Sequence, residues 1–242
     1  MDAASPDRPR RPLRRPTIAG TRSVGDRVRR ALAPALCVLA GIAVSGLVAA
    51  SAGPEDDADA LRSWPDGWYS REAAIMGTRI RVELQAEARE AAVAAIDAVL
   101  EELRRIDATY STWSDASELS RVNREAGRGP TRAHDELLEL LRESREVSEL
   151  TGGAFDVTYA SAGRLYDFRA GVRPGDEARR AAVAAIDYRY VELDRDAGTV
   201  RYAHPDVWVD LGGIAKGYAV DRAMELLLAR GVRNAAVAAG GD

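Results

Sequence analysis

Hydrophobic patterns of two kinds intermix along most of this chain, and that mixture limits the fold more than any other feature. Apolar side chains recur at every second position in 80–84, and at helical spacing in about 87–107 and 134–150. The segments 188–193 and 199–202 are spaced as two strands of a hairpin. Because helices and hairpins mix without a strict strand–helix–strand repeat, the sequence predicts an α+β fold with mixed or antiparallel sheets and packed helices.

The helix predicted at 134–150 can be described in detail from its sequence. Its inward side chains are expected to be Leu137, Leu138, Leu141 and Leu150. Gly152 and Gly153 follow directly and suit a C-terminal cap, where glycine is preferred because the backbone turns left-handed.

The C-terminal third supplies further elements. Asp176 is a candidate N-cap of a short helix that reaches about residue 186. A strand is expected at 207–211, then a helix at about 215–229 that ends at Gly231. A small-residue strand at 234–238 leads into Gly240-Gly241-Asp242. Because such a strand needs a turn and a partner beyond this point, we interpret the chain as lacking its C-terminal part.

The first 52 residues have the features of an export segment. An Arg- and Pro-rich start precedes an uncharged apolar run at 31–52, which ends in Ala50-Ser51-Ala52. A basic start, an apolar stretch and a small-x-small site are typical of a secretory signal. The run is also long enough to cross a bilayer, so an uncleaved anchor is the alternative. Either way, we expect the rest of the chain outside the cytoplasm, in the periplasm or on the outer face of the membrane.

The predicted organisation therefore has three parts. Residues 1–52 form the signal peptide or anchor, 53–72 form a polar lead-in, and 73–242 form the main domain. Three aromatic residues of the lead-in are expected to pack on that domain: Trp64, Trp68 and Tyr69.

Charge and cysteine content exclude several classes of protein. Residues 1–52 are rich in arginine, whereas the whole chain carries a formal charge of −4. Residues 53–242 are therefore acidic. An acidic body argues against a nucleic-acid partner, because little of it could neutralise a phosphate backbone. The one cysteine, Cys37, lies in the apolar run, so the body has neither a disulfide framework nor thiolate chemistry.

The strongest local pattern for chemistry runs from Asp210 to Asp221, as a strand, a glycine turn and a helix start. Glycines let a backbone approach a ligand closely, and a helix N-terminus offers unpaired N–H groups to an anion. The pattern also holds Lys216, the only lysine of the chain. It matches neither a P-loop nor a Rossmann glycine motif. The alternative is a tight strand-to-helix turn with a solvated lysine.

Two further segments combine aromatic and polar residues. One is Thr151–Thr158, which contains Phe155 and Asp156. The other joins Tyr110-Ser111-Thr112-Trp113 to Ser117-Glu118-Leu119 and Asn123, where a Trp could stack on a planar ring. A capped helix end with one core aromatic, and a half-buried Trp in a loop, are the structural alternatives.

The two histidines, His134 and His204, have neither the spacing of a zinc site nor a Ser/His/Asp set. A metal in this protein would therefore be a hard cation bound by oxygen atoms.

Together, these segments in this order resemble the ApbE family of FAD:protein FMN transferases. The resemblance covers about Ala73 to Asp242 and opens with Met76-Gly77-Thr78. It continues through the Trp113 and Phe155 segments to Asp210–Asp221 and Gly240-Gly241-Asp242. Several motifs in register, rather than any single one, carry the resemblance.

The resemblance implies a set of site residues. Seven match positions that line the family's FAD site: Met76, Trp113, Ala154, Phe155, Asp156, Asp210 and Lys216. The backbone carbonyl of Gly213 matches a position that helps to hold Mg²⁺. The remaining metal ligands and the general base of the family are expected beyond Asp242, so no catalytic base is assigned.

The implied reaction moves FMN from FAD onto a threonine hydroxyl of an acceptor protein and releases AMP, with Mg²⁺ required. The acceptor is expected to be an exported or membrane electron-transfer subunit. Two alternatives use the same residues: an Mg²⁺-dependent FAD pyrophosphatase, and an exported FAD-binding protein without turnover.

Overall fold

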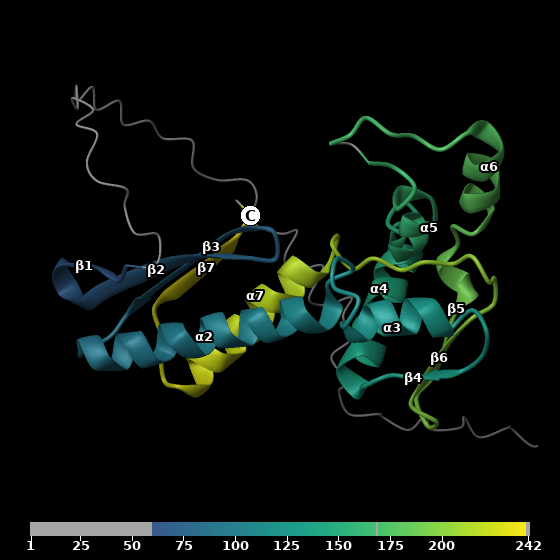
Figure 1. Ribbon diagram of the computed structural model, residues 1–242. Coiled ribbons are helices and arrows are strands. Elements are labelled where there is room, and N and C mark those ends of the chain that lie inside the picture. Colours follow the sequence, from purple (N-terminus) through teal and green to yellow (C-terminus); the bar gives the residue numbers. More distant parts are fainter. Residues whose placement is uncertain (1–59, 168, 241–242) are drawn as a thin grey trace, which may run out of the picture. The chain divides into compact units, whose positions relative to one another are not determined.

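The computed structural model describes residues 60–167 and 169–240 (Figure 1). The predicted signal or anchor at 1–52, Cys37 within it, and Gly241-Asp242 all lie outside the described residues. Within the described part, no helix combines the length and the apolar character that crossing a membrane requires.

A four-stranded antiparallel sheet forms one layer, in the order β1-β2-β3-β7. Its strands are β1 (Arg62–Trp64), β2 (Trp68–Ile75), β3 (Thr78–Gln85) and β7 (Ala235–Ala239). The strands predicted at 80–84 and 234–238 are confirmed as β3 and β7 to within a few residues.

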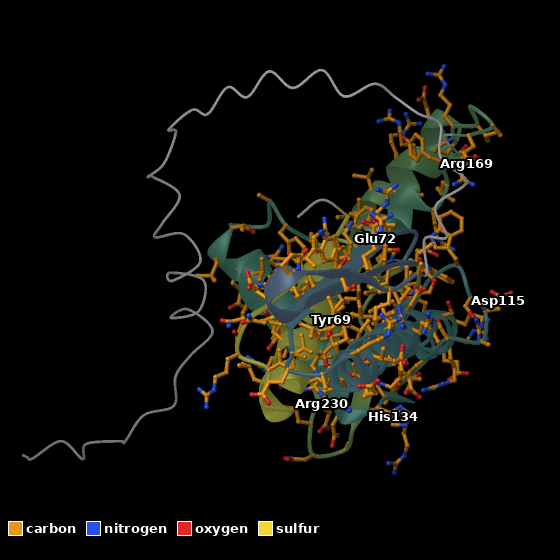
Figure 2. All side chains as sticks on the ribbon, turned by 90° about the vertical axis from the view of Figure 1, so that its left-hand side faces the viewer. Tyr69, Glu72, Asp115, His134, Arg169 and Arg230 are labelled. Carbon is orange, nitrogen blue, oxygen red and sulfur yellow. The ribbon has the colours of Figure 1, made fainter. Side chains whose placement is uncertain are left out.

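The helices α2 (Arg89–Tyr110) and α7 (Ala215–Ala229) cover one face of this sheet (Figure 1). The three alternate apolar residues of β3 are fully buried: Ile80, Val82 and Leu84. Charged residues between them lie on the other face. Figure 2 shows Tyr69 and Glu72 of β2 on opposite sides of the sheet. The alternation follows from the two-residue period of a strand with one solvated face.

A second, three-stranded antiparallel sheet has the order β4-β6-β5. Its strands are β4 (Thr131–Arg132), β5 (Val191–Asp194) and β6 (Thr199–Tyr202). The other described helices are α3 (Glu118–Glu125), α4 (Asp135–Leu150), α5 (Ala160–Gly163) and α6 (Asp176–Ala184), with 3₁₀ turns η2 (Val157–Tyr159) and η3 (Tyr188–Tyr190). The predicted hairpin is confirmed as β5–β6, although 188–190 is a 3₁₀ turn. The α+β class is confirmed.

The end of α4 has the predicted glycine cap. The Gly153 N–H donates to the Ser148 carbonyl (2.8 Å) and the Gly152 N–H to that of Glu149 (3.2 Å), a Schellman arrangement. Gly152 has φ 63°, which glycine adopts at little cost. Leu150, by contrast, is 62% exposed rather than buried, because the last helical residue lies beyond the core that Leu137 and Leu138 fill.

Two other expectations differ from the structure. Asp176 is the first residue of α6 and not its N-cap, which is Gly175. The end of the expected lead-in, residues 68–72, belongs to strand β2, with Tyr69 packed against the core and Trp64 still 43% exposed. Charged residues interrupt the alternation of β2, since Arg71 points to the helix side and pairs with Asp97 of α2. Because of this charged residue on the helix side, the sequence of β2 does not show the apolar alternation of a strand.

The segment 207–211, expected as a strand, joins neither sheet. Side chains satisfy the backbone of Trp208 and Val209 instead, and the Asp210 N–H donates to the Val157 carbonyl (2.9 Å). Asn123 binds both polar groups of Val209: its Oδ1 accepts from the N–H (2.9 Å) and its Nδ2 donates to the carbonyl (2.8 Å). The Trp208 N–H donates to Ser161 Oγ (2.9 Å). Buried backbone groups require partners of some kind, so this extended segment is stable without a neighbouring strand.

Replacing Asn123 with Ala is expected to destabilise the fold by about 2–4 kcal/mol, because Val209 and the Tyr202 hydroxyl lose their buried partner. Asn234→Ala is the matched control, since that exposed side chain bonds only Gln85 and should cost less than about 1 kcal/mol. Urea unfolding measures the free energy of unfolding of both variants. Equal losses of stability would contradict the proposed role of Asn123.

Candidate functional site

The Asp210 carboxylate joins three segments that are distant in sequence. It accepts hydrogen bonds from Thr112 Oγ1 (2.7 Å), the Tyr159 hydroxyl (3.1 Å) and the Gly212 N–H (2.7 Å). Burial, followed by the charge of Asp210, raises the pKa of Tyr159 to about 12, so its hydroxyl keeps its proton at neutral pH. These bonds hold the glycine turn, residues 211–214, against the segments that contain Trp113 and Phe155.

Phe155 packs against the glycine turn. A Cβ placed on Gly213 would lie 3.1 Å from Phe155 Cε2, so only glycine fits there without displacing the ring. Residues 212 and 213 are both exposed, although the residues on either side of them are buried or half-buried. A ligand can therefore approach the backbone closely at this turn.

Asp156 lies beside this turn but uses its side chain within the protein. Its Oδ1 accepts from the N–H and hydroxyl of Thr158 (2.8 and 2.6 Å), which caps η2. Its Oδ2 accepts from the Tyr188 N–H (2.9 Å). Asp156 therefore fixes the short segment that presents Phe155 and Tyr159.

Lys216 is the second residue of α7, directly after the glycine turn. An ideal Cβ on Gly240 would lie 3.7 Å from Lys216 Nζ and 3.2 Å from Thr78 Oγ1, so these three residues are neighbours. Among residues 60–167 and 169–240, no hydrogen bond or ion pair involves the half-buried Lys216 side chain. An anion at the start of α7 would find this ammonium unpaired.

Met76 forms the turn between β2 and β3 with Gly77. Both have positive φ, 56° and 68°, as a two-residue hairpin turn requires. Such a conformation is uncommon for a methionine. The Met76 N–H donates to Asp107 Oδ2 of α2 (3.1 Å), which stabilises the turn, and the side chain packs against the core.

Two predicted site residues are solvent-exposed. Trp113 is 97% exposed, and Ala154 also faces solvent. The structure thus brings Thr112, the neighbour of Trp113, into the cluster, whereas the indole itself contacts none of the other site residues. An exposed ring at this position is free to stack on a planar ligand.

Three residues that bind this cluster together were not recognised from the sequence: Asp107, Tyr159 and Ser161. Each acts through a hydrogen bond to a residue between 31 and 51 positions away. Only for Tyr159 did the sequence offer a signal, since it follows the Phe155-Asp156 pair by a few residues.

The residues fit a metal only in part. In the described ranges no three His, Cys, Asp or Glu residues gather as a metal site would require. The Gly213 carbonyl accepts no backbone hydrogen bond from the described residues, so it is available as one oxygen ligand of a hard cation. No second ligand can be assigned here.

A concavity of the described part lies away from these residues. It has a volume of about 1150 Å³ and lies where β3 ends and α7 gives way to β7, between Gln85 and Arg230. None of the predicted site residues lines it. The site is therefore a set of converging backbone and side-chain groups, not an enclosed cavity.

Comparison with known proteins identifies the family of this chain. The model of the ApbE family matches residues 76–242, which is most of the chain. The chain belongs to the ApbE family. All seven residues predicted to line the ApbE flavin site, and Gly213, fall inside the matched range.

Two proteins named FAD:protein FMN transferase are similar to this chain. The chain is 32% identical over 183 residues to the FAD:protein FMN transferase of Treponema pallidum, covering 72% of this chain and 50% of that protein. It is 33% identical over 153 residues to the one of Vibrio cholerae (61% and 44%).

Solved ApbE structures show the same fold. The flavin transferase ApbE from Vibrio cholerae has a TM-score of 0.63 at 28% identity, over 73% of this chain and 58% of that one. The ApbE protein from Thermotoga maritima has a TM-score of 0.65 at 28% identity, over 72% and 57%. The chain spans about half the length of the curated relatives it matches.

Gly213→Ala is expected to destabilise this ApbE chain by about 1–2 kcal/mol, because the new methyl group must displace the Phe155 ring. Gly217→Ala is the matched control: nothing lies within 4 Å of its Cβ, and alanine favours the helix by about 0.5–1 kcal/mol. Thermal unfolding should show opposite signs, and a stabilised Gly213→Ala would refute the packing against Phe155.

Proposed function

We propose that this protein is an Mg²⁺-dependent FAD:protein FMN transferase. The observation that supports it best is Lys216 at the start of α7, which has no partner among the described residues and directly follows a glycine turn that Asp210 fixes. Family membership and the names of the relatives point the same way. The acceptor would be another protein with an accessible threonine.

The FAD donor would bind across the glycine turn and the first turn of α7. Lys216 and the free N–H groups at the helix start would hold the pyrophosphate. Met76, Trp113 and Phe155 would contact the planar rings, and Ala154 would leave room beside them. Asp210 and Asp156 would act by fixing the backbone, since their oxygens already accept protein hydrogen bonds.

In the reaction, the threonine oxygen of the acceptor would bond to the FMN phosphorus as the bond to AMP breaks. The hydroxyl proton would pass to a base that these residues do not supply. Lys216 would hold the leaving part of the nucleotide by charge. When bound, Mg²⁺ would offset negative charge on the phosphates, with the Gly213 carbonyl as one ligand.

Two other functions would use the same site. A pyrophosphatase would transfer the FMN group to water, and a binding protein would hold FAD unchanged. The exposure of Trp113 and of the glycine turn favours transfer to a macromolecule, because an acceptor can reach this surface.

The export segment predicted at 1–52 supports a role outside the cytoplasm, either in the periplasm or at the outer face of the membrane. An exported or membrane electron-transfer subunit would then be the acceptor. Mass measurement of the mature N-terminus would distinguish a cleaved signal from a retained anchor.

The test incubates the full gene product, and residues 53–242 alongside it, with FAD, Mg²⁺ and a candidate acceptor domain. Intact-mass spectrometry should show an added FMN on the acceptor only when Mg²⁺ is present. AMP and free FMN without an adduct would indicate the pyrophosphatase, and intact FAD would indicate a binding protein.

Lys216→Ala should raise the KM for FAD about 10- to 100-fold, the loss expected for a charged contact to phosphate. Arg230→Ala is the control, because this cation lies just beyond the other end of α7. Equal KM values for wild type and Lys216→Ala would rule out the placement of the pyrophosphate.

A further inference from the structure

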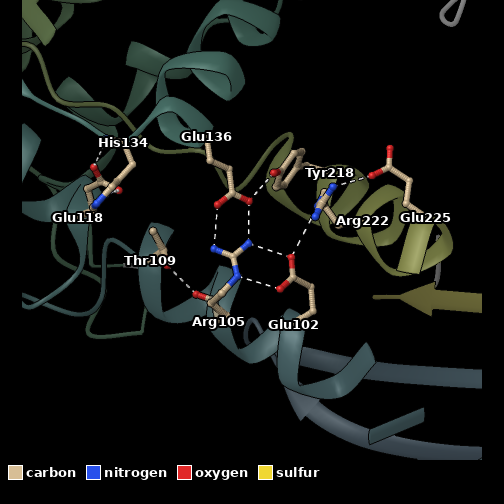
Figure 3. A network of polar contacts seen from close by, with 9 residues as sticks. All are labelled: Glu102, Arg105, Thr109, Glu118, His134, Glu136, Tyr218, Arg222 and Glu225. Carbon is tan, nitrogen blue, oxygen red and sulfur yellow. Dashed lines mark hydrogen bonds and ion pairs between the residues drawn. The ribbon is translucent and has the colours of Figure 1, made fainter. Parts of the chain in front are cut away.

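A network of charged and aromatic side chains joins α2, α4 and α7 beside the candidate site (Figure 3). Arg105 of α2 donates to both oxygens of Glu136 on α4 (2.7 and 2.8 Å). It also donates to both oxygens of Glu102 on its own helix (2.8 and 2.9 Å). The Tyr218 hydroxyl of α7 completes the network by donating to Glu136 Oε1.

We infer that Glu136 is a positioning residue, which holds the first turn of α7 and therefore Lys216 in place. The consequence for ligand binding rests on the function proposed above, whereas the effect on the helix start does not.

The first turn of α7 needs such support because its own sequence stabilises it poorly. Gly217 lies within this turn and Gly212 and Gly213 just before it, and glycine in a helix lowers its stability relative to other residues. The N-cap residue, Ile214, makes no side-chain capping bond. Tyr218 follows Lys216 by two residues, and its hydroxyl bond to Glu136 ties this turn to α4.

The same tyrosine also connects the turn to the Trp113 segment. Its ring packs edge-to-face against Tyr110 at 6.4 Å between centroids. Tyr110 is buried and ends α2, two residues before Thr112, which binds Asp210. Glu136 thus faces a pair of tyrosines that support the two sides of the candidate site.

The charge state of Glu136 suits this role. Its hydrogen bonds with Arg105, opposed in part by burial, lower its pKa to about 2, so the carboxylate stays ionised above that pH. The groups that face it are Arg105, Tyr218 and Tyr110, and Arg222 reaches the network through Glu102 at 3.6 Å. A charged acceptor strengthens the bond from Tyr218.

A purely stabilising ion pair is the alternative. The Arg105 and Glu136 side chains are 43% and 30% exposed, and such pairs contribute little to global stability. Removing the charge should therefore leave the fold intact and change chiefly the order of the helix start.

The experiment compares Glu136→Gln and Tyr218→Phe with Asp135→Asn as the control. Asp135 lies in the same turn of α4 and has the same effect on the helix dipole, but it is exposed and outside the network. Hydrogen exchange of amides 214–218 is measured without ligand, FAD affinity is measured by flavin fluorescence, and the thermal midpoint is recorded for each variant.

Both network variants should exchange about fivefold faster in this turn and bind FAD about fivefold more weakly, the size expected for one such contact. The double variant should be no worse than Tyr218→Phe alone, because Glu136→Gln acts on this turn by weakening the acceptor of the bond that Tyr218→Phe removes. Asp135→Asn should behave as wild type.

Unchanged exchange in Glu136→Gln, or an equal change in Asp135→Asn, would overturn the inference. So would a loss of thermal stability that accounts for the faster exchange throughout the protein. If the wild type binds no FAD, the proposed function fails, and the exchange measurement still decides whether Glu136 positions the helix start.

Discussion

The carboxylate of Asp210 is the contact on which the site depends. It accepts from Gly212 within the glycine turn, and from Thr112 and Tyr159, which fixes two distant segments relative to that turn. Asp210 can do this only because the extended segment before it is held in place. Asn123 and Ser161 bind that segment through its backbone, so they position the carboxylate without touching a ligand.

The helices and hairpins were predictable because local patterns determine them. The bounds of α7 and β6 agree with the prediction to the residue, and those of α4 nearly so. In each case a regular apolar period is bounded by glycine or by a capping residue. The glycine turn was predictable for the same reason, since the glycines and the lysine are adjacent in the sequence.

The other parts of the fold and of the site depend on polar contacts between distant residues. Such contacts produce no periodic pattern in a sequence. Segment 207–211 has the composition of a strand, yet Asn123 replaces the neighbouring strand from over eighty positions away. Asp107 of helix α2 likewise stabilises the turn in which Met76 has a positive φ. The sequence pattern does not predict strand β2, because Arg71 occupies a position where a regular alternation would have an apolar residue.

This reliance on side chains in place of a strand ladder has a physical consequence for the site. A ladder would have placed the backbone of 207–211 between two neighbours and left the glycine turn flanked by strands. Asn123, Ser161 and the Val157 carbonyl satisfy buried groups of this segment without a neighbouring strand, and residues 212 and 213 are open to solvent. The glycines that permit a close ligand approach also make the helix start intrinsically weak. A site built in this way needs anchors outside the turn, and the contacts of Asp210 on one side and of Tyr218 on the other supply them.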